Sequence, residues 1–321
     1  MFGSLDRAYQ VLTHGFWRGQ FIKLGTPSEN EYPRLIEILK KRFSPQAGKY
    51  LIEREEQWEK LARTLVRQAL NVRLPKRTVK LRTLIDEWRK HLECAIEMDS
   101  HLIKHKDRIM AEGPRGLTNS LDALCREGVF HQGYSWSCSH CAYRNWSSLD
   151  ALRMTLECQV CHQVHNTPID LEFDFRMNEF LATCLREHDT LSIVWALGRL
   201  QRRTRSASFI FAPQTELFRK YPDNDIAVAD REIDLLCIID GKVVIGEVKA
   251  SLAEIDQQEV DALVAIAGEI HADIVVIGAM EGEEGKLVPK LEEVRKRVGP
   301  SIEVQGMLGR EDGDHIEHYL P

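Results

Sequence analysis

Apolar residues recur every three or four positions along much of the first 130 residues of the chain. The pattern is clearest in three segments, 31–43, 49–70 and 78–98. This spacing predicts amphipathic helices. Pro75 separates the second helix from the third, and the AEGPRG cluster at 111–116 is expected to end the helical region. A short further helix is predicted over 118–128, with Gly128 at its end.

The C-terminal half of the chain alternates between apolar runs and amphipathic segments. A helix is predicted over 178–203. Strands and helices then follow over 208–212, 231–240, 242–250, 254–270, 272–280, 286–298 and 301–308. In order they give a helix, three strands, a helix and a strand, with further elements. This order is typical of an α/β layer arrangement.

Between these two regions, residues 129–170 form short polar and aromatic pieces grouped around cysteines. A chain of 321 residues has room for two or three domains. We therefore predict a multidomain α+β or α/β protein. Its parts are a basic helical domain at 1–117, a cysteine-centred domain with its preceding short helix at 118–170, and a C-terminal α/β domain at 171–321.

Four of the eight cysteines form two C-x-x-C pairs, Cys138 with Cys141 and Cys158 with Cys161. Each C-x-x-C turn lets two thiolates converge on one ion, and two such turns supply a tetrahedral site of four cysteines. The sequence therefore predicts a zinc ribbon with structural Zn²⁺. A redox pair explains only one C-x-x-C, and an iron–sulfur cluster is the remaining alternative for four cysteines.

Histidine and aromatic residues surround the two cysteine pairs. His140, His162 and His165 are alternative ligands or ordinary surface residues. The side chains near the first pair have two interpretations. They stack on unpaired bases of a nucleic acid, or they cover the small core of the ribbon, which is the interpretation we favour. These side chains are Tyr134, Trp136, Tyr143, Arg144 and Trp146.

The net charge of −6 is unevenly distributed along the chain. Residues 1–130 carry 24 Lys and Arg against 17 Asp and Glu, which gives +7, and residues 171–321 carry 17 against 29, which gives −12. Nine of the basic residues lie between Arg63 and Lys90. This asymmetry suggests that the basic part grips a polyanion on which the acidic part acts. Solvated helix faces would explain the same charges without a ligand.

The composition is that of an ordinary globular protein, with 43% hydrophobic and 29% charged residues. No apolar run approaches the roughly 20 residues that a membrane-spanning helix needs. The first ten residues, MFGSLDRAYQ, lack the basic and apolar regions of a signal peptide. We therefore expect an intracellular, cytoplasmic location and no membrane partner.

The stretch REIDLLCIIDGKVVIGEVKA carries the main chemical signal. Asp240-Gly241 between two apolar runs predicts a two-residue hairpin loop. The register of that loop places Asp234 directly opposite Glu247, with Lys249 two residues further along the same sheet face. Two facing carboxylates among apolar residues are destabilising unless a cation lies between them. A divalent metal together with the lysine would supply that charge.

These residues, spaced D-x12-E-x-K on consecutive strands followed by a helix and a strand, resemble the PD-(D/E)xK phosphodiesterase superfamily. The wording EIDLL and GEVK is similar to its Mrr, NERD and resolvase-like branches. The resemblance implies a restriction-endonuclease-like αβββαβ core with nuclease activity. Mg²⁺ or Mn²⁺ would be held by Asp234, Glu247 and the backbone carbonyl of Val248. Lys249 would orient or help to deprotonate the attacking water and stabilise the pentavalent phosphate.

The sequence departs from that pattern at the first acidic position, where Glu232-Ile-Asp234 replaces the Pro-Asp pair. Related nucleases often carry a further Glu on the first core helix. Glu179 is the preferred candidate because it opens the predicted helix, and Glu187 and Glu216 are the alternatives.

The helix after the E-x-K motif offers two further residues of interest. Gln257 and Gln258 either face the site, as a Gln does in some relatives, or are solvated. Ser251 with Glu254 fits a capping box at the start of this helix.

The implied function is Mg²⁺-dependent hydrolysis of nucleic acid, DNA more than RNA. By analogy alone, this activity would suit a bacterial restriction or anti-phage defence effector. The ribbon and the basic helices would engage the nucleic acid, a protein partner or a second copy of the chain. The alternative is a catalytically silent zinc-ribbon subunit that binds nucleic acid or serves as an adaptor.

Overall fold

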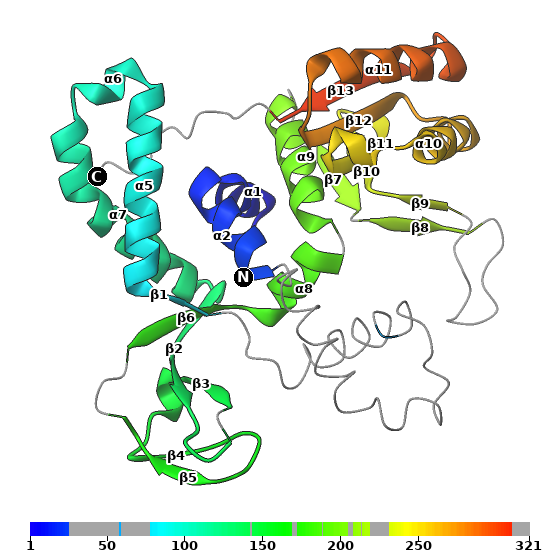
Figure 1. Ribbon diagram of the computed structural model, residues 1–321. Coiled ribbons are helices and arrows are strands. Elements are labelled where there is room, and N and C mark those ends of the chain that lie inside the picture. The colour runs from blue at the N-terminus through cyan, green and yellow to red at the C-terminus, as the bar shows by residue number, and fades with distance from the viewer. Residues whose placement is uncertain are drawn as a thin grey trace, which may run out of the picture. The chain divides into compact units, whose positions relative to one another are not determined.

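The computed structural model describes residues 1–25, 58, 78–141, 143–168, 172–187, 189–204, 208–212, 214–218 and 231–309. Within these ranges the chain is a mixed α+β protein (Figure 1). The helices predicted over 31–43 and 49–70 lie outside the described residues, as do the basic residues from Arg63 to Arg77. No helix in the described ranges is both long enough and apolar enough to cross a membrane.

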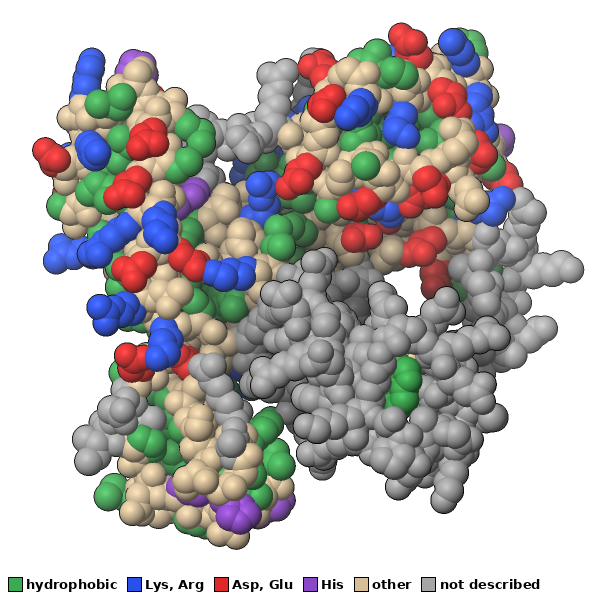
Figure 2. All heavy atoms as spheres, viewed as in Figure 1, with side chains coloured by type: hydrophobic (Ala, Val, Ile, Leu, Met, Phe, Trp, Pro, Cys, Tyr) green, Lys and Arg blue, Asp and Glu red, His purple; other side chains and the backbone are tan. Residues whose placement is uncertain are grey.

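The chain divides into two compact units, whose sequences do not follow the three predicted domains. We call residues 1–21 with 183–321 the sheet unit, and residues 22–182 the ribbon unit. The sheet unit has 18 basic and 27 acidic residues, which gives −9, and the ribbon unit has 25 and 22, which gives +3. Acidic side chains are prominent on the visible face of the sheet unit (Figure 2).

The first 21 residues belong to the sheet unit because helix α1 (Leu5–Thr13) packs on helix α9 (Thr190–Arg203). Tyr9 lies so close to Gly198 that a Cβ atom there would meet its ring at 2.2 Å. The Arg202 guanidinium lies 4.3 Å from the centre of the same ring. This packing corrects the prediction of a separate N-terminal helical domain over 1–117.

The ribbon unit combines long helices with two small sheets. The helices are α5 (Leu81–Met98), α6 (Ser100–Ile103) and α7 (Lys106–Arg126). One sheet has the order β1-β6-β2-β3, from Thr78–Lys80, Phe173–Met177, Phe130–Ser137 and Arg144–Ser148. The other pairs β4 (Thr155–Glu157) with β5 (Val164–Asn166). Strand β6 was predicted to belong to the C-terminal domain, but it joins this unit because it pairs with β1 and β2.

Helix α7 runs through the AEGPRG cluster, so the predicted break at 111–116 is wrong. Helix α5 packs closely against α7 at this point. The indole of Trp88 on α5 donates a hydrogen bond to the Gly113 carbonyl at 2.8 Å. A Cβ atom at Gly113 would meet the side chain of Leu92 at 2.4 Å, so the glycine allows α5 and α7 to approach closely.

The sheet unit is built on five strands in the order β13-β12-β11-β10-β7. They span Glu303–Leu308, Ile274–Glu281, Lys242–Ser251, Leu235–Ile239 and Phe209–Ala212. The strands β11, β12 and β13 are parallel, while β10 is antiparallel to both of its neighbours. The predicted strands are therefore present, in a mixed sheet.

Helices cover both faces of this sheet (Figure 1). Helix α9 packs on one face, and α10 (Gln257–Glu269) and α11 (Glu284–Val298) pack on the other. The helix predicted over 178–203 is two helices, α8 (Glu179–Glu187) and α9. Asp189, which precedes α9, has a left-handed backbone with φ of 43°. Strands β8 (Thr215–Leu217) and β9 (Arg231–Ile233) pair with each other in a separate two-stranded sheet.

Candidate functional site

The hairpin between β10 and β11 has the predicted register. Ile239 pairs with Lys242 and Leu235 pairs with Gly246, so the loop consists of two residues. Those residues are Asp240 and Gly241, with φ angles of 51° and 82°. Positive φ at both positions is the conformation of a type I′ turn, which explains why Asp-Gly occupies the loop.

This register brings the three predicted residues of the motif together. Asp234 directly precedes β10, and its Oδ2 accepts a hydrogen bond from the Val248 backbone N–H at 3.0 Å. The Lys249 Nζ lies 3.1 Å from Asp234 Oδ2 and 2.7 Å from Glu247 Oε1. The lysine ammonium therefore lies between the two strand carboxylates.

The three charged groups are largely removed from solvent. Asp234 is 3% exposed and Glu247 is 9% exposed. Burial, together with the negative charge of Asp234, raises the pKa of Glu247 to about 8. Burial alone would lower the pKa of Lys249, but its hydrogen bonds and ion pairs with Glu247 and Asp234 raise it above its ordinary value. Lys249 lowers the pKa of Glu247, but burial and the charge of Asp234 outweigh that effect.

Two carboxylates that the sequence did not single out also face Lys249. Glu259 on α10 has Oε1 at 3.5 Å from the ammonium, and Asp189 at the start of α9 has Oδ2 at 4.0 Å. They come from helices on opposite faces of the sheet. Only the packing of those helices brings them to the end of β11, so no local spacing in the sequence could have indicated it.

The position of Glu259 follows from a capping box at the start of α10. Asp256 is the N-cap, with its side chain accepting from two backbone N–H groups, and Glu259 accepts from the Asp256 backbone N–H at 3.1 Å. The capping box predicted for Ser251 with Glu254 is therefore wrong. Ser251 instead caps the short 3-10 turn η3 (Leu252–Glu254) by accepting from the Ala253 N–H. The D-x-x-E spacing at 256–259 would have indicated the correct cap.

The other predicted candidates have different surroundings. Glu179 begins α8 within the ribbon unit and pairs there with Arg176. Glu216 lies on β8, opposite Glu232 of β9. The side chain of Glu187 lies outside the described residues.

Both glutamines at the start of α10 are exposed, and they differ in their hydrogen bonds. Gln257 donates to Asp261 at 3.1 Å and to Glu293 on α11 at 2.6 Å, so its amide is directed along the helix pair. Gln258 is exposed.

A pocket of about 220 Å³ opens beside the lysine. Helix α10 supplies its apolar wall, and carboxylates dominate its polar wall. The lining residues are Gln214, Glu232, Asp234, Glu247, Lys249, Glu259, Ala262, Leu263 and Ile266. Four acidic groups against one basic group make this pocket attractive to a cation.

The backbone carbonyl of Val248 already has one partner. The buried hydroxyl of Ser192 on α9 lies 3.4 Å from this oxygen and donates to the Asp189 carbonyl at 2.8 Å. A carbonyl oxygen has two lone pairs, so the contact with Ser192 leaves Val248 able to accept a second interaction.

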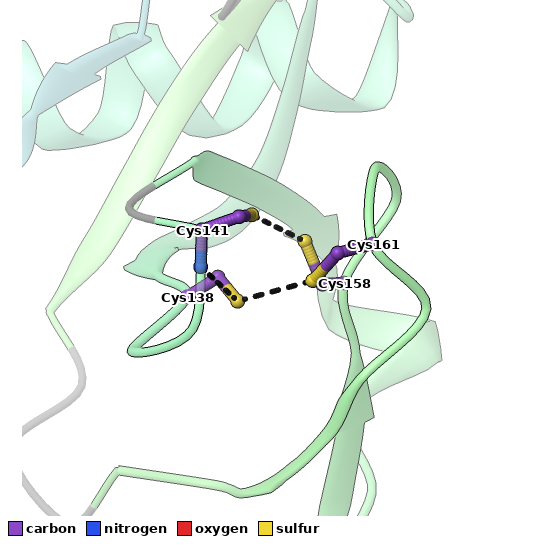
Figure 3. A group of neighbouring side chains, drawn as sticks. All are labelled: Cys138, Cys141, Cys158 and Cys161. Carbon is purple, nitrogen blue, oxygen red and sulfur yellow. Dashed lines mark hydrogen bonds between the residues drawn. The ribbon is translucent and has the colours of Figure 1, made fainter.

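The second polar cluster is formed by the four predicted cysteines. Their sulfur atoms all lie within 4.8 Å of one another, and Figure 3 shows the side chains pointing together from two loops. Cys138 and Cys161 have their sulfurs 3.5 Å apart, and Cys141 and Cys158 have theirs 3.6 Å apart. Sulfurs bound to one tetrahedral zinc ion by bonds of about 2.3 Å would be about 3.8 Å apart. The cluster could therefore hold a zinc ion.

Hydrogen-bond donors surround Cys158, one of the two buried members of this cluster. Burial alone would raise the pKa of the Cys158 thiol. The N–H groups of Cys161, Val160 and Asn145 outweigh that effect and lower this pKa to about 6. His165 is the histidine close to the cluster, with Nε2 at 3.2 Å from the Cys138 sulfur. Donors of this kind favour the thiolate form that binds a metal.

The aromatic residues near the first cysteine pair have separate roles. Tyr134 and Trp136 are buried in the ribbon core, and Tyr143 packs against that core, as the favoured interpretation predicted. Trp146 lies against Gly133, where a Cβ atom would meet its ring at 2.4 Å, and Arg176 lies 5.0 Å from the ring centre. The side chain of Arg144 lies outside the described residues.

No protein-family model matches this chain, and no curated protein sequence matches it.

Proposed function

We propose that this protein is a metal-dependent nuclease that hydrolyses phosphodiester bonds in nucleic acid, with DNA as the preferred substrate. One observation carries the proposal. Asp234 and Glu247 are buried, face each other across a two-residue hairpin and share the ammonium of Lys249. This arrangement agrees with the resemblance of the D-x12-E-x-K spacing to PD-(D/E)xK nucleases.

The donor set fits a hard divalent cation. Both carboxylates offer oxygen ligands, and Mg²⁺ commonly binds through one or two carboxylates while keeping several waters. Both carboxyl groups are buried, and a further positive charge beside them would stabilise their ionised form. Asp234 and Glu247 would hold Mg²⁺ or Mn²⁺, with the Val248 carbonyl as an additional ligand. When bound, the metal would acidify a water molecule and neutralise charge on the phosphate oxygens.

Lys249 would contribute through its positive charge. Its pKa is raised by the neighbouring carboxylates, so the side chain remains protonated at neutral pH. A protonated lysine cannot remove a proton from water. It can donate hydrogen bonds that orient the attacking water and stabilise the negative charge that develops on the phosphate. This favours the orienting role over the deprotonating role among the two that the resemblance implies.

The cysteine cluster is assigned a structural role in this proposal. Four thiolates fill a tetrahedral zinc shell and leave no position for water or substrate. The ribbon unit carries a net charge of +3 and the sheet unit carries −9, so the ribbon unit is the better candidate for contact with a polyanion. By analogy, such an enzyme would act in the cytoplasm as a restriction or anti-phage effector.

A silent binding or adaptor subunit is the second candidate. Its supporting observation is that the Lys249 ammonium already bridges the two carboxylates that a catalytic metal would use. Among the residues that the structure describes, the cysteines are the one group of three or more possible metal ligands whose donor atoms lie within 4.8 Å of one another. The carboxylates around Lys249 do not form such a group.

A nuclease assay separates the two candidates. Supercoiled plasmid, single-stranded DNA and RNA would be incubated with the protein in Mg²⁺, Mn²⁺ or EDTA. We expect cleavage only with the divalent cation, and its loss in Lys249→Ala. Lys242→Ala is the matched control, because Lys242 lies on the same strand, is 57% exposed and lies 3.8 Å from Glu303. Equal cleavage by the wild type and Lys249→Ala would refute the proposal that this protein is a nuclease.

A further inference from the structure

Three carboxylates lie within 3.5 Å of the Lys249 ammonium. Glu247 is at 2.7 Å, Asp234 is at 3.1 Å and Glu259 is at 3.5 Å. A lysine ammonium has three N–H donors, so three acceptors can satisfy it. Two of these acceptors are the strand carboxylates assigned to the metal, whereas Glu259 comes from helix α10.

Glu259 is fixed by its second oxygen. Its Oε2 accepts from the Asp256 backbone N–H at 3.1 Å in the capping box, while its Oε1 faces Lys249. The carboxylate cannot turn away from the lysine without breaking the cap. Its side chain is only 29% exposed, compared with 53% for Asp189, which lies 4.0 Å from the ammonium. Glu259 is therefore the more rigid of the two helix carboxylates that face Lys249.

We propose that Glu259 is a positioning residue that holds the Lys249 ammonium beside the pocket when Asp234 and Glu247 are engaged with a divalent cation. This inference rests on the proposed function. A carboxylate that binds a divalent cation has less negative charge to offer a lysine. The attraction of Asp234 and Glu247 for Lys249 then weakens, and the acceptor on α10 keeps the side chain directed towards the pocket.

Glu259→Gln is the sharpest test. Glutamine at this position still supplies an oxygen to the capping box, so the helix start is preserved while the charge is lost. We expect kcat to fall about 10- to 100-fold, the usual effect of losing an outer-shell partner, with KM little changed. Gln258→Ala is the matched control: Gln258 is an exposed neighbour on the same helix, and its replacement leaves both the capping box and the Glu259 carboxylate in place, so kcat should remain at the wild-type value.

A second measurement does not depend on catalysis. The rate at which an amine-reactive reagent labels Lys249 can be followed by mass spectrometry, and a paired ammonium is labelled slowly. In saturating Mn²⁺, Glu259→Gln should label several-fold faster than wild type. In EDTA the two proteins should be similar, because Asp234 and Glu247 still hold the lysine.

The outcomes separate this inference from the proposed function. Absence of nuclease activity in the wild type, with the Mn²⁺-dependent labelling difference intact, would reject the nuclease and keep the positioning role. Equal labelling of wild type and Glu259→Gln in Mn²⁺ would overturn the positioning role. A labelling increase in Asp189→Asn but not in Glu259→Gln would also overturn the positioning role of Glu259, because it would assign that role to Asp189.

Discussion

The four cysteines form one polar cluster, and Lys249 with the carboxylates around it forms a second, which we call the Lys249 cluster. The two clusters differ in how their negative charge is balanced. The cysteine cluster brings together four sulfur atoms that bind a metal as thiolates, each with one negative charge. The Lys249 cluster contains its own cation, which already pairs with both strand carboxylates. The first cluster therefore depends on a metal for its charge balance, whereas the second is partly balanced without one. This difference predicts a larger loss of stability when a metal is removed from the cysteine cluster than when one is removed from the Lys249 cluster.

Loss of zinc should have the largest effect on the protein. Cys158→Ser, at a fully buried ligand, or treatment with a strong zinc chelator should unfold the ribbon around β4 and β5. Structural zinc sites are associated with apparent binding free energies of about 10–16 kcal/mol. Metal analysis should find one zinc per wild-type chain, and hydrogen exchange should localise the unfolding to the ribbon. Cys94→Ser is the control, since Cys94 is exposed. If the ribbon lost its zinc and kept its protection from hydrogen exchange, the cysteine cluster would not depend on a metal, and the predicted difference between the two clusters would be wrong.

Removing the internal cation should be the next largest effect. Lys249→Met leaves Asp234 and Glu247 buried without a positive neighbour. Breaking a buried ion pair in this way costs about 3–5 kcal/mol. The lower end is expected, because Glu247 can take up a proton. The free energy of unfolding from urea titration in EDTA should fall for Lys249→Met and hardly change for Lys242→Met. An equal change in both variants would mean that the buried carboxylates do not need the lysine.

The pH dependence of stability sharpens the comparison further. The pKa of Glu247 is about 8 in the folded protein against an ordinary value of 4.5, so the folded state binds a proton that the unfolded state releases. Metal-free stability should therefore fall as the pH rises from about 4.5 to about 8. Urea titrations in EDTA between pH 5 and 9 would measure this slope.

Glu247→Gln should flatten that slope, because the residue that binds the extra proton is gone. Glu254→Gln, at an exposed position, should leave it unchanged. Adding Mg²⁺ at pH 8 should stabilise the wild type more than Glu247→Gln. A slope that persists in Glu247→Gln would show that another group is responsible.

The smallest expected effect concerns the helix that carries Glu259. Asp256→Ala removes the N-cap side chain of α10 and should lower the free energy of unfolding by about 1 kcal/mol. Ser251→Ala should cost less, because Ser251 caps a turn of only three residues. Thermal unfolding of the two variants would compare them. Zinc content should be unchanged in both, and a loss of zinc from Asp256→Ala would show that the two clusters are coupled.

The parts of these sites that were predictable from sequence are those set by local geometry. The two-residue loop at Asp240-Gly241 determines the register of β10 and β11, and so places Asp234 near Glu247. The C-x-x-C spacing likewise determines which sulfurs converge. Asp234 and Glu247 flank one hairpin, and each C-x-x-C pair lies in the turn of one hairpin, β2–β3 or β4–β5, so short-range rules were sufficient there. The convergence of the two cysteine pairs depends in addition on the packing of these two hairpins.

The parts that were missed depend on packing between elements distant in sequence. Asp189 and Glu259 reach Lys249 only because α9 and α10 pack on opposite faces of the same sheet. Helix α7, which continues past Pro114, contacts Trp88 and Leu92 of another helix at Gly113. Propensity and periodicity carry no information about such contacts, which override the local signals.

The packing of α1 on α9 has a consequence for the order in which the protein forms during synthesis. The sheet unit begins with the first residues of the chain, but its remaining sequence starts only at Thr183. The ribbon unit is thus an insertion in the sheet unit, and its whole sequence is translated before α9 exists. Domains generally fold as units while the chain grows. Helix α1 must therefore wait without its partner while the ribbon unit is made. If the cysteine cluster holds zinc, the cellular zinc supply would act on the nascent chain before any of the five-stranded sheet has been made.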